Sequence, residues 1–232
     1  MAISLKKGQG ISLRKSDYDL SRVTIGLGWD CADPSEQQFE IVERKKSGLS
    51  GMFGGTERVR VPIDAPEWDL DVIAFLCDAS GKVKDLGDLN NGKPTLVNGD
   101  IVFFNSMQHR SGHIWLTGDN RDGSGDGDDE QIIANLNEIP ENIEKIAFIV
   151  HIYQGKRNGQ NFSGVNNAFI RAVDNKGKEM TRFDLSGGES FESHCSMIFA
   201  ELCREGTGWK LIAIGEPFET DNFVDILRKR YL

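Results

Sequence analysis

Ile146-Ala-Phe-Ile-Val-His-Ile-Tyr153 is the stretch that decides the fold, because only His151 interrupts its apolar run. A continuous apolar run of this kind is typical of a strand that is covered on both faces and lies in the middle of a sheet. Asp69-Leu-Asp-Val-Ile-Ala-Phe-Leu-Cys77 is a second strong strand segment. Its two aspartates are two residues apart and therefore share one face. Because a strand cannot bury two carboxylates on one face without partners, we expect Asp69 and Asp71 to meet solvent or a cation.

Shorter strands surround these two segments. Alternating apolar residues predict strands at 23–29, 99–105 and 113–117, and hairpins that join 168–173 to 179–185 and 195–203 to 209–214. Residues 3–13 fit either a hairpin or two short strands, and residues 130–136 fit helical or strand spacing. The two halves are similar in rhythm, which predicts an all-β fold: a β-sandwich of two packed sheets with a few short helices.

At 232 residues the chain is long enough for one large domain or two small ones. We predict a single sandwich domain over residues 1–216. A flexible, glycine-rich insertion is expected at about 44–58, where the sequence reads Arg44-Lys-Lys-Ser-Gly-Leu-Ser-Gly-Met-Phe-Gly-Gly-Thr-Glu57. Residues 217–232 are expected to form a C-terminal helical extension, with Thr220 as its N-cap.

Composition excludes several classes of protein. A net charge of −9 argues against general nucleic-acid binding, which needs a basic surface. No apolar run approaches the roughly 20 residues of a transmembrane helix, and the N-terminal residues do not resemble a signal peptide. The four cysteines are scattered, with no metal-binding or disulfide pattern. We therefore expect a cytoplasmic protein with reduced thiols.

The densest charge lies in Gly118-Asp-Asn-Arg-Asp-Gly-Ser-Gly-Asp-Gly-Asp-Asp-Glu130, which we call the acidic loop. It holds six acidic residues, four glycines and one arginine. Such charges repel one another strongly unless the loop is extended or a cation neutralises it. Glycines let the backbone turn tightly enough to aim several oxygens at one ion, which is what Ca²⁺ requires. Calcium is therefore the leading interpretation, and a solvated acidic connector is the alternative.

The acidic loop is not an EF-hand. Counting from Asp122 puts Ile133 at the twelfth position, where a bidentate glutamate is required. Counting from Asp119 puts Glu130 there, but Arg121 and Gly123 then occupy ligand positions. A calcium shell would therefore need ligands from other segments, and the aspartates at predicted strand ends, Asp30, Asp69 and Asp71, are the best placed.

The acidic loop resembles the signature of the TerD-type tellurium-resistance and stress-protein family. Further similarities lie at Ile25-Gly-Leu-Gly-Trp-Asp30, residues 68–78, residues 100–105, residues 161–171 and Trp209-Lys210, so the resemblance covers about residues 1–216. It implies a bacterial cytoplasmic protein with a calcium-binding β-sandwich that holds one or two ions. It also implies a role in resistance to tellurite and other stresses, together with other stress and tellurite-resistance proteins in assemblies that associate with the membrane.

Carried onto this chain, the resemblance and the strand-end argument give one set of metal ligands and no catalytic residue. The candidates are Asp30, Asp69, Asp71, Asn105, Asp119, Asn120, Asp126, Asp128, Asp129 and Glu130. The function expected is that of a calcium-binding, non-enzymatic scaffold or sensor.

The alternative function is a metal-dependent phosphate-ester hydrolase that uses the same carboxylates. It would need a base such as His109, His113, His151 or His194. Of these, His109 and His113 are the nearest to the acidic loop in the sequence. Direct reduction of tellurite by cysteines is the weakest hypothesis, because Cys77, Cys195 and Cys203 fall in apolar strands. Gly26-Leu-Gly28 is too short for a phosphate-binding loop and fits close packing within a strand.

Overall fold

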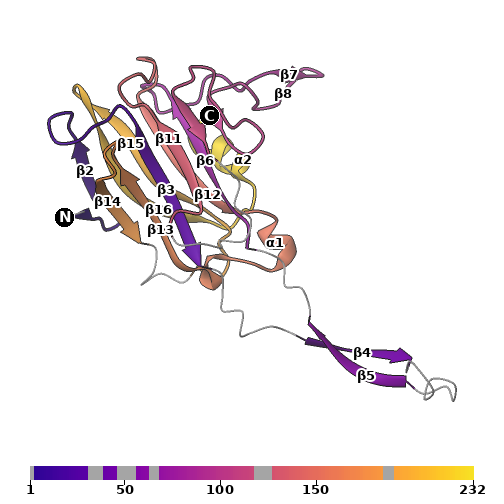
Figure 1. Cartoon of the computed structure of the whole chain (residues 1–232). Helices are drawn as coiled ribbons and strands as arrows, with labels where there is room; N and C mark the ends of the chain where they lie inside the picture. Colours follow the sequence, from indigo (N-terminus) through magenta and orange to yellow (C-terminus); the bar gives the residue numbers. More distant parts are fainter. Residues whose placement is uncertain (1–2, 31–38, 46–55, 63–67, 118–126, 185–190) are drawn as a thin grey trace. The chain divides into compact units, whose positions relative to one another are not determined.

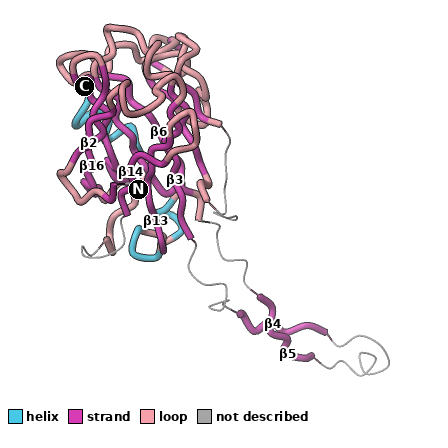
Figure 2. Tube along the Cα trace, turned by 60° about the vertical axis from the view of Figure 1, so that its left-hand side comes forward, coloured by secondary structure: helices cyan, strands magenta, loops and turns pink. Residues whose placement is uncertain are grey.

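A computed structural model of the chain describes residues 3–30, 39–45, 56–62, 68–117, 127–184 and 191–232. The chain forms two compact units, one made of residues 1–31 and 68–232 and the other of residues 32–67 (Figure 1). The larger unit contains two six-stranded sheets. In the described ranges, helix occurs as short segments beside these sheets (Figure 2).

The first sheet, sheet A, has the order β1-β14-β13-β3-β11-β10. Its strands pair antiparallel, except that β1 runs parallel to β14. Their bounds are β1 Ile3–Ser4, β14 Glu179–Asp184, β13 Asn166–Val173, β3 Val23–Asp30, β11 Glu130–Ala134 and β10 Ile114–Leu116.

The second sheet, sheet B, has the order β2-β16-β15-β12-β6-β9 and is antiparallel throughout. Its strands are β2 Gly10–Leu13, β16 Gly208–Phe218, β15 Ser196–Glu205, β12 Lys145–Ile152, β6 Leu70–Cys77 and β9 Ile101–Val102. The apolar run that decides the fold is β12, and it lies inside the sheet between β15 and β6, as predicted.

The main hydrophobic core lies between the two sheets and takes alternate residues from each strand. On β6, for example, Leu70, Val72 and Ala74 face this core, whereas Ile73 and Phe75 belong to a second cluster. That second cluster covers the outer face of sheet B with residues of α2 (Phe223–Ile226) and η4 (Leu227–Tyr231). Two-sided burial therefore explains why β6 and β12 lack the alternation of half-exposed strands.

The prediction of an all-β sandwich with a C-terminal helix is confirmed. Residues 3–13 form two short strands in different sheets and not a hairpin, and residues 130–134 form a strand. The last helix begins later than predicted, because its N-cap is Asn222, whose side chain accepts a hydrogen bond from the Val224 amide. Thr220 instead donates from its hydroxyl to Asp225, at 2.8 Å.

The smaller unit contains a hairpin of β4 (Phe39–Lys45) and β5 (Thr56–Pro62), which pair antiparallel. The ends of the predicted insertion at 44–58 therefore lie in strands, and its residues 46–55 lie outside the described parts of the chain. Short elements complete the larger unit: β7 Leu89–Asn90, β8 Lys93–Pro94, α1 Gly155–Asn158 and η3 Phe162–Gly164. In the described parts of the chain, no helix has the length and apolar character that crossing a membrane would require.

Candidate metal centre

Three strand ends from distant parts of the sequence meet at one end of the sandwich. The indole N–H of Trp29, near the end of β3, donates to the Trp68 carbonyl just before β6, at 3.2 Å. β11 begins beside them, because Glu130 pairs with Leu27 of β3. The acidic loop leads into β11, so its last residues are held where β3 ends and β6 starts.

Glu130 points inward, between the sheets. It lies on the same face of β11 as Ile132, which belongs to the core, and it is only 1% exposed. The Val72 amide of β6 donates to Glu130 Oε2 at 2.6 Å. This amide is on the side of β6 that faces β9, and the pairing of β9 covers only Ala74 and Phe75. The carboxylate therefore takes the place of a missing strand and joins sheet A to sheet B.

Asp129 is fixed along the end of β3. Its amide donates to the Leu27 carbonyl at 2.8 Å, and its carboxylate accepts a hydrogen bond from the Trp29 amide at 2.9 Å. These two bonds extend the pairing between β3 and β11 by a side chain, so the direction of this carboxylate is set by the backbone of β3.

Asp128 lies on the outer face of sheet A, directly over Gly26. A Cβ at Gly26 would fall 2.2 Å from the carboxylate, so any side chain there would displace it. Arg171 of β13 donates from Nε to Asp128 Oδ1 at 2.7 Å, and Gln131 donates to Oδ2 at 3.4 Å. The Asp128 side chain is 3% exposed, and its hydrogen bond is the main cause of a raised pKa for Arg171. Asp128 is thus already paired with a cation.

The glycine pattern Gly26-Leu-Gly28 has the close-packing role that its position in a strand predicted. At Gly28 a Cβ would fall 2.4 Å from the ring of Phe169, which lies over the same face. Arg182 stacks on that ring, with its guanidinium carbon 3.5 Å from the centroid. The two glycines therefore form a shallow trough that receives Asp128 and Phe169.

Asp71 faces away from Glu130. It shares its face of β6 with Ile73, under the C-terminal helix, and the core-facing Val72 lies between them in sequence. His151 Nε2 lies 2.8 Å from Asp71 Oδ2, and His151 Nδ1 lies 3.1 Å from the Asp221 carbonyl. Asp71 and His151 are each 4% exposed, so this pair ties β6 and β12 to the start of the helix.

The remaining predicted ligands are placed as follows. The Asp69 carbonyl accepts a hydrogen bond from the Tyr153 amide at 2.8 Å, so Asp69 lies at the same end of the sandwich as Glu130. Asp30 ends β3 and pairs with Asn166. Asn105 is exposed in the turn after β9, and the ring of its neighbour Phe104 packs edge-on against Tyr153. Asp119, Asn120 and Asp126 lie outside the described residues.

Within the described ranges, no group of three or more histidine, cysteine, aspartate or glutamate side chains is placed to hold a metal ion. The complete ligand set therefore stays a prediction. The oxygens that this end of the sandwich offers fit a hard cation such as Ca²⁺, because they come from carboxylates and from strand-end backbone. Two of the predicted carboxylates, Asp71 and Asp128, already pair with His151 and Arg171.

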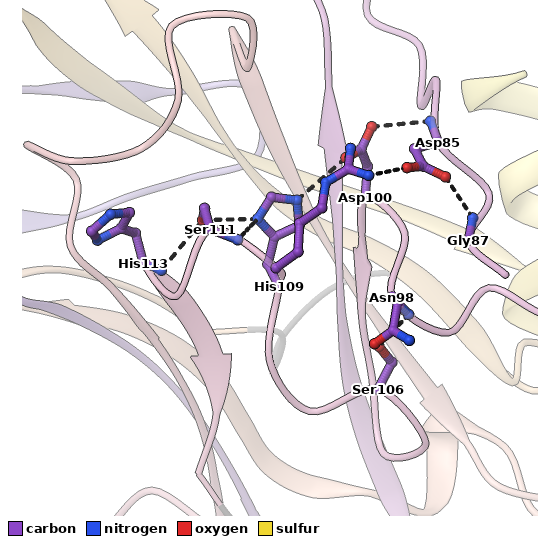
Figure 3. A network of polar contacts seen from close by, with 9 residues as sticks. Asp85, Gly87, Asn98, Asp100, Ser106, His109, Ser111 and His113 are labelled. Carbon is purple, nitrogen blue, oxygen red and sulfur yellow. Dashed lines mark hydrogen bonds and ion pairs between the residues drawn. The ribbon is translucent and has the colours of Figure 1, made fainter.

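A separate polar network joins the loops that follow β6 and β9 (Figure 3). Its centre is the buried Asp100, whose carboxylate lies 3.3 Å from His109 Nε2 and 3.3 Å from a terminal nitrogen of Arg110. The Asp85 amide donates to the same carboxylate at 3.0 Å, and the Asp85 side chain pairs with Arg110. Burial raises the pKa of Asp100, but hydrogen bonds from His109 and Asp85 and the charge of Arg110 outweigh it, so the net pKa is lowered.

His109 and His113 of the hydrolase hypothesis lie away from Glu130, the last residue of the acidic loop. His113 accepts a hydrogen bond at its carbonyl from the Asn135 amide, and the His109 amide donates to the Ile114 carbonyl at 3.0 Å. Both contacts are at the end of β10 and β11 remote from Glu130, about 16 Å away by the rise of a strand. His109 is also 3% exposed and held by Asp100 and Ser111. Among the described residues, neither histidine therefore lies beside the end of the acidic loop at Glu130.

The three cysteines in the described part of the chain, Cys77, Cys195 and Cys203, do not form a reactive site. Cys77 and Cys203 flank Lys145 on neighbouring strands, so their Cα atoms are about 10 Å apart, too far for a disulfide. Burial raises the pKa of Cys77 to about 12, and burial also raises the pKa of Cys195 and of Cys203. The thiolate is the nucleophile, so these thiols are poorly reactive at neutral pH.

The sequence predicted a close-packing role for Gly26 and a candidate base in His151, but it did not predict what either residue contacts, and it gave Arg171 no role. The signal for Gly26 was present, because a glycine in the middle of a strand marks a close approach by another group. Arg171 gave no local signal, because its partner Asp128 is 43 residues away in the sequence.

Comparison with known proteins agrees with this architecture. The family model described as the TerD domain matches residues 1–229. The chain is 61% identical over 228 residues to "Tellurium resistance protein TerX" of Serratia marcescens, covering 98% of this chain and 99% of that protein. It is 35% identical over 230 residues to "Stress response protein SCP2" of Bacillus subtilis, covering 99% of each.

Among solved structures, a homologue of telluride resistance protein (TerD) from Streptomyces coelicolor is similar in fold. The TM-score is 0.54 at 20% sequence identity, and the match covers 88% of this chain and 94% of that one. At this identity the likeness concerns the fold alone. The family model and the full-length relatives go further, and they show that the chain belongs to the TerD domain family.

Proposed function

We propose that this chain is a calcium-binding, non-enzymatic protein that serves tellurite resistance and the general stress response. The names of its relatives support the resistance and stress role. One structural observation supports calcium: three consecutive acidic residues end the acidic loop, and each is held by a contact from a different direction. Asp128 lies over the outer face, Asp129 along β3 and Glu130 between the sheets. The loop is thus anchored where other strand-end oxygens converge.

In this proposal Ca²⁺ binds between the acidic loop and the strand ends, with Asp129, Glu130, Asp69 and Asp30 as the ligands nearest to the anchored end. Ca²⁺ accepts six to eight oxygens in flexible geometry, whereas Mg²⁺ demands near-ideal octahedral geometry. A loop of alternating aspartate and glycine suits the larger ion. The ion would neutralise charge that otherwise repels within the loop, and one or two ions could be held.

The test is calorimetric titration of metal-stripped protein with Ca²⁺ and, separately, with Mg²⁺. We expect heat with Ca²⁺ and a higher melting temperature, since a ligand at 100 times its Kd stabilises the native state by about 2.7 kcal/mol. Replacing Asp126 and Asp129 by asparagine should remove both effects, whereas Asp17→Asn, an exposed carboxylate elsewhere, should leave them. Absence of heat together with an unchanged melting temperature would contradict the proposal.

We further propose that the protein acts in the cytoplasm, in assemblies with other tellurite-resistance and stress proteins, some of them at the membrane. The support is the family relationship. Copurification of the tagged chain from tellurite-treated cells, with calcium or with a chelator in the buffer, tests it. Recovery of the same partners with calcium and with the chelator would show that assembly does not depend on bound calcium.

The hydrolase alternative gains no support from His109 and His113, because both lie at the end of β10 and β11 that is remote from Glu130. It still makes a definite prediction: phosphatase activity that depends on Mg²⁺ or Mn²⁺ and falls on His109→Ala or His113→Ala. We expect no such activity.

A further inference from the structure

Of the three described acidic residues of the acidic loop, Asp128 has the surroundings that fit a cation ligand least. Its carboxylate is 3% exposed, it lies over Gly26, and it accepts from Arg171 Nε at 2.7 Å. Turning it toward an ion would leave Arg171 without this partner and open a hole above the glycine. Both consequences cost free energy, because a buried charge that loses its partner is destabilising.

The position of Arg171 is itself fixed by the sheet. Arg171 pairs with Gly26 of β3 on one side and with Arg182 of β14 on the other, and Gly26 pairs with Gln131 of β11. These residues form one row across the outer face of sheet A. Arg171 also donates from a terminal nitrogen to Glu179 of β14 at 3.1 Å, so its guanidinium is held between two carboxylates. The planar group suits this role, because it donates in fixed directions.

We propose that Arg171 is the positioning residue of the acidic loop: it binds Asp128 as an anchor and so holds Asp129 and Glu130 in place for the cation. This rests on the proposed calcium function and refines it, because it removes Asp128 from the ligand set. Anchoring lowers the number of residues that the ion must order, and outer contacts that orient metal ligands typically change metal affinity by about 10-fold to 100-fold.

The experiment compares Ca²⁺ affinity in Arg171→Met, Asp128→Asn and the double variant. If Asp128 is an anchor, Arg171→Met weakens Ca²⁺ binding by about 10-fold or more. The double variant then binds no worse than the weaker single variant, because both substitutions break the same contact. If Asp128 is instead a ligand for which Arg171 competes, Arg171→Met strengthens binding while Asp128→Asn weakens it. Tighter Ca²⁺ binding in Arg171→Met together with weaker Ca²⁺ binding in Asp128→Asn would overturn the proposal.

Arg182→Met is the matched control. Arg182 lies in the same row of sheet A and carries the same charge, but it contacts Phe169 and Asp184 rather than Asp128. Removing its charge should leave Ca²⁺ affinity unchanged or slightly raise it. Arg171→Lys should restore part of the affinity, because it keeps the charge and loses the paired geometry. Equal losses in Arg171→Met and Arg182→Met would indicate a general effect on stability and would overturn the proposal.

A second readout does not depend on calcium. In metal-free protein, hydrogen exchange of the Asp129 amide, which donates to the Leu27 carbonyl, reports whether the end of the loop is held. We expect exchange at least 10-fold faster in Arg171→Met than in Arg182→Met. Hydrogen exchange of the Asp129 amide at the same rate in both variants would overturn the proposal that Arg171 anchors the loop. Absence of Ca²⁺ binding in the wild-type protein together with faster exchange would reject the calcium function and keep the anchor.

Discussion

Glu130 is a buried acid whose hydrogen bond crosses between two sheets, and its two oxygens make different substitutions informative. Glu130→Ala removes the acceptor for the Val72 amide, so we expect a loss of about 1–3 kcal/mol in the free energy of unfolding. Glu130→Gln keeps an acceptor and removes a buried charge, so in a chelator it should be at least as stable as the wild type. Urea unfolding measures both.

Adding Ca²⁺ should make the wild-type protein more stable than Glu130→Gln. Wild-type protein should gain stability, and Glu130→Gln should gain little, because the glutamine amide lacks the charge that binds the ion. An equal gain in the two proteins would show that Glu130 is a structural acid alone.

Asp100 makes the protein sensitive to acid. Its pKa in the folded protein lies below its ordinary value of about 4, so its ionised form stabilises the fold above that pH. This stabilisation is lost as the pH falls through the lowered pKa. Asp100→Asn should therefore be less stable than the wild type at pH 7, and the difference should narrow below about pH 4. Urea midpoints between pH 7 and pH 2, taken in a chelator, test this, and Asp17→Asn is the exposed control. A difference that stays constant with pH would contradict it.

The residue contacts that the sequence could not predict depend mostly on which residues of neighbouring strands pair with each other. Asp30, Asp69 and Asp71 were expected beside the acidic loop because each lies near the end of a predicted strand. The sequence predicted that Asp71 and Asp69 share one face of a strand. It did not predict that Asp71 faces the C-terminal helix. Its partner His151 is 80 residues away, and only the pairing of β6 with β12 brings them together.

At the scale of elements, the C-terminal helix is part of the fold rather than an appendage. Phe223 is 6% exposed, and its ring centroid lies 5.5 Å from Phe103 and 6.2 Å from Phe75. We expect Phe223→Ala to reduce the free energy of unfolding by about 3–5 kcal/mol, the usual result of emptying a buried aromatic site. The exposed Arg228→Ala, in the same helix, should stay within about 0.5 kcal/mol. Similar losses of unfolding free energy in the two variants would show that the C-terminal helix does not unfold cooperatively with the sandwich.

The strands of the sandwich were predictable to the extent that their pattern is local. β12 and β6 are marked by apolar composition, and the hairpins of β13 with β14 and of β15 with β16 are marked by short turns. The hairpin of β4 and β5 was missed, because charged and glycine-rich sequence is typical of loops and its pairing joins segments on either side of 46–55.

At the scale of the whole molecule, the larger unit carries the described cores. Both hydrophobic clusters consist of residues from 1–31 and 68–232. The contact between Trp29 and the Trp68 carbonyl, at 3.2 Å, holds together the two points where residues 32–67 leave and rejoin this unit. We therefore expect a chain in which a short glycine-serine linker replaces 32–67 to keep a β-rich circular dichroism spectrum and to unfold in one cooperative transition.

Linker length provides the control for that replacement. Each doubling of the linker length should lower the free energy of unfolding by about 0.6 kcal/mol, because a longer loop loses more entropy when it closes. A much larger dependence, or a loss of cooperativity with every linker, would show that the smaller unit contributes to the fold of the larger one.

The two N-terminal strands have a consequence for biosynthesis. β1 pairs with β14 and β2 with β16, so Ile3 meets Thr181 and Leu13 meets Trp209. A ribosome releases these partners long after residues 3–13 have emerged. Residues 3–13 must therefore wait without these partners until β14 and β16 have been synthesised, so the pairing of β1 and β2 is a late step in folding.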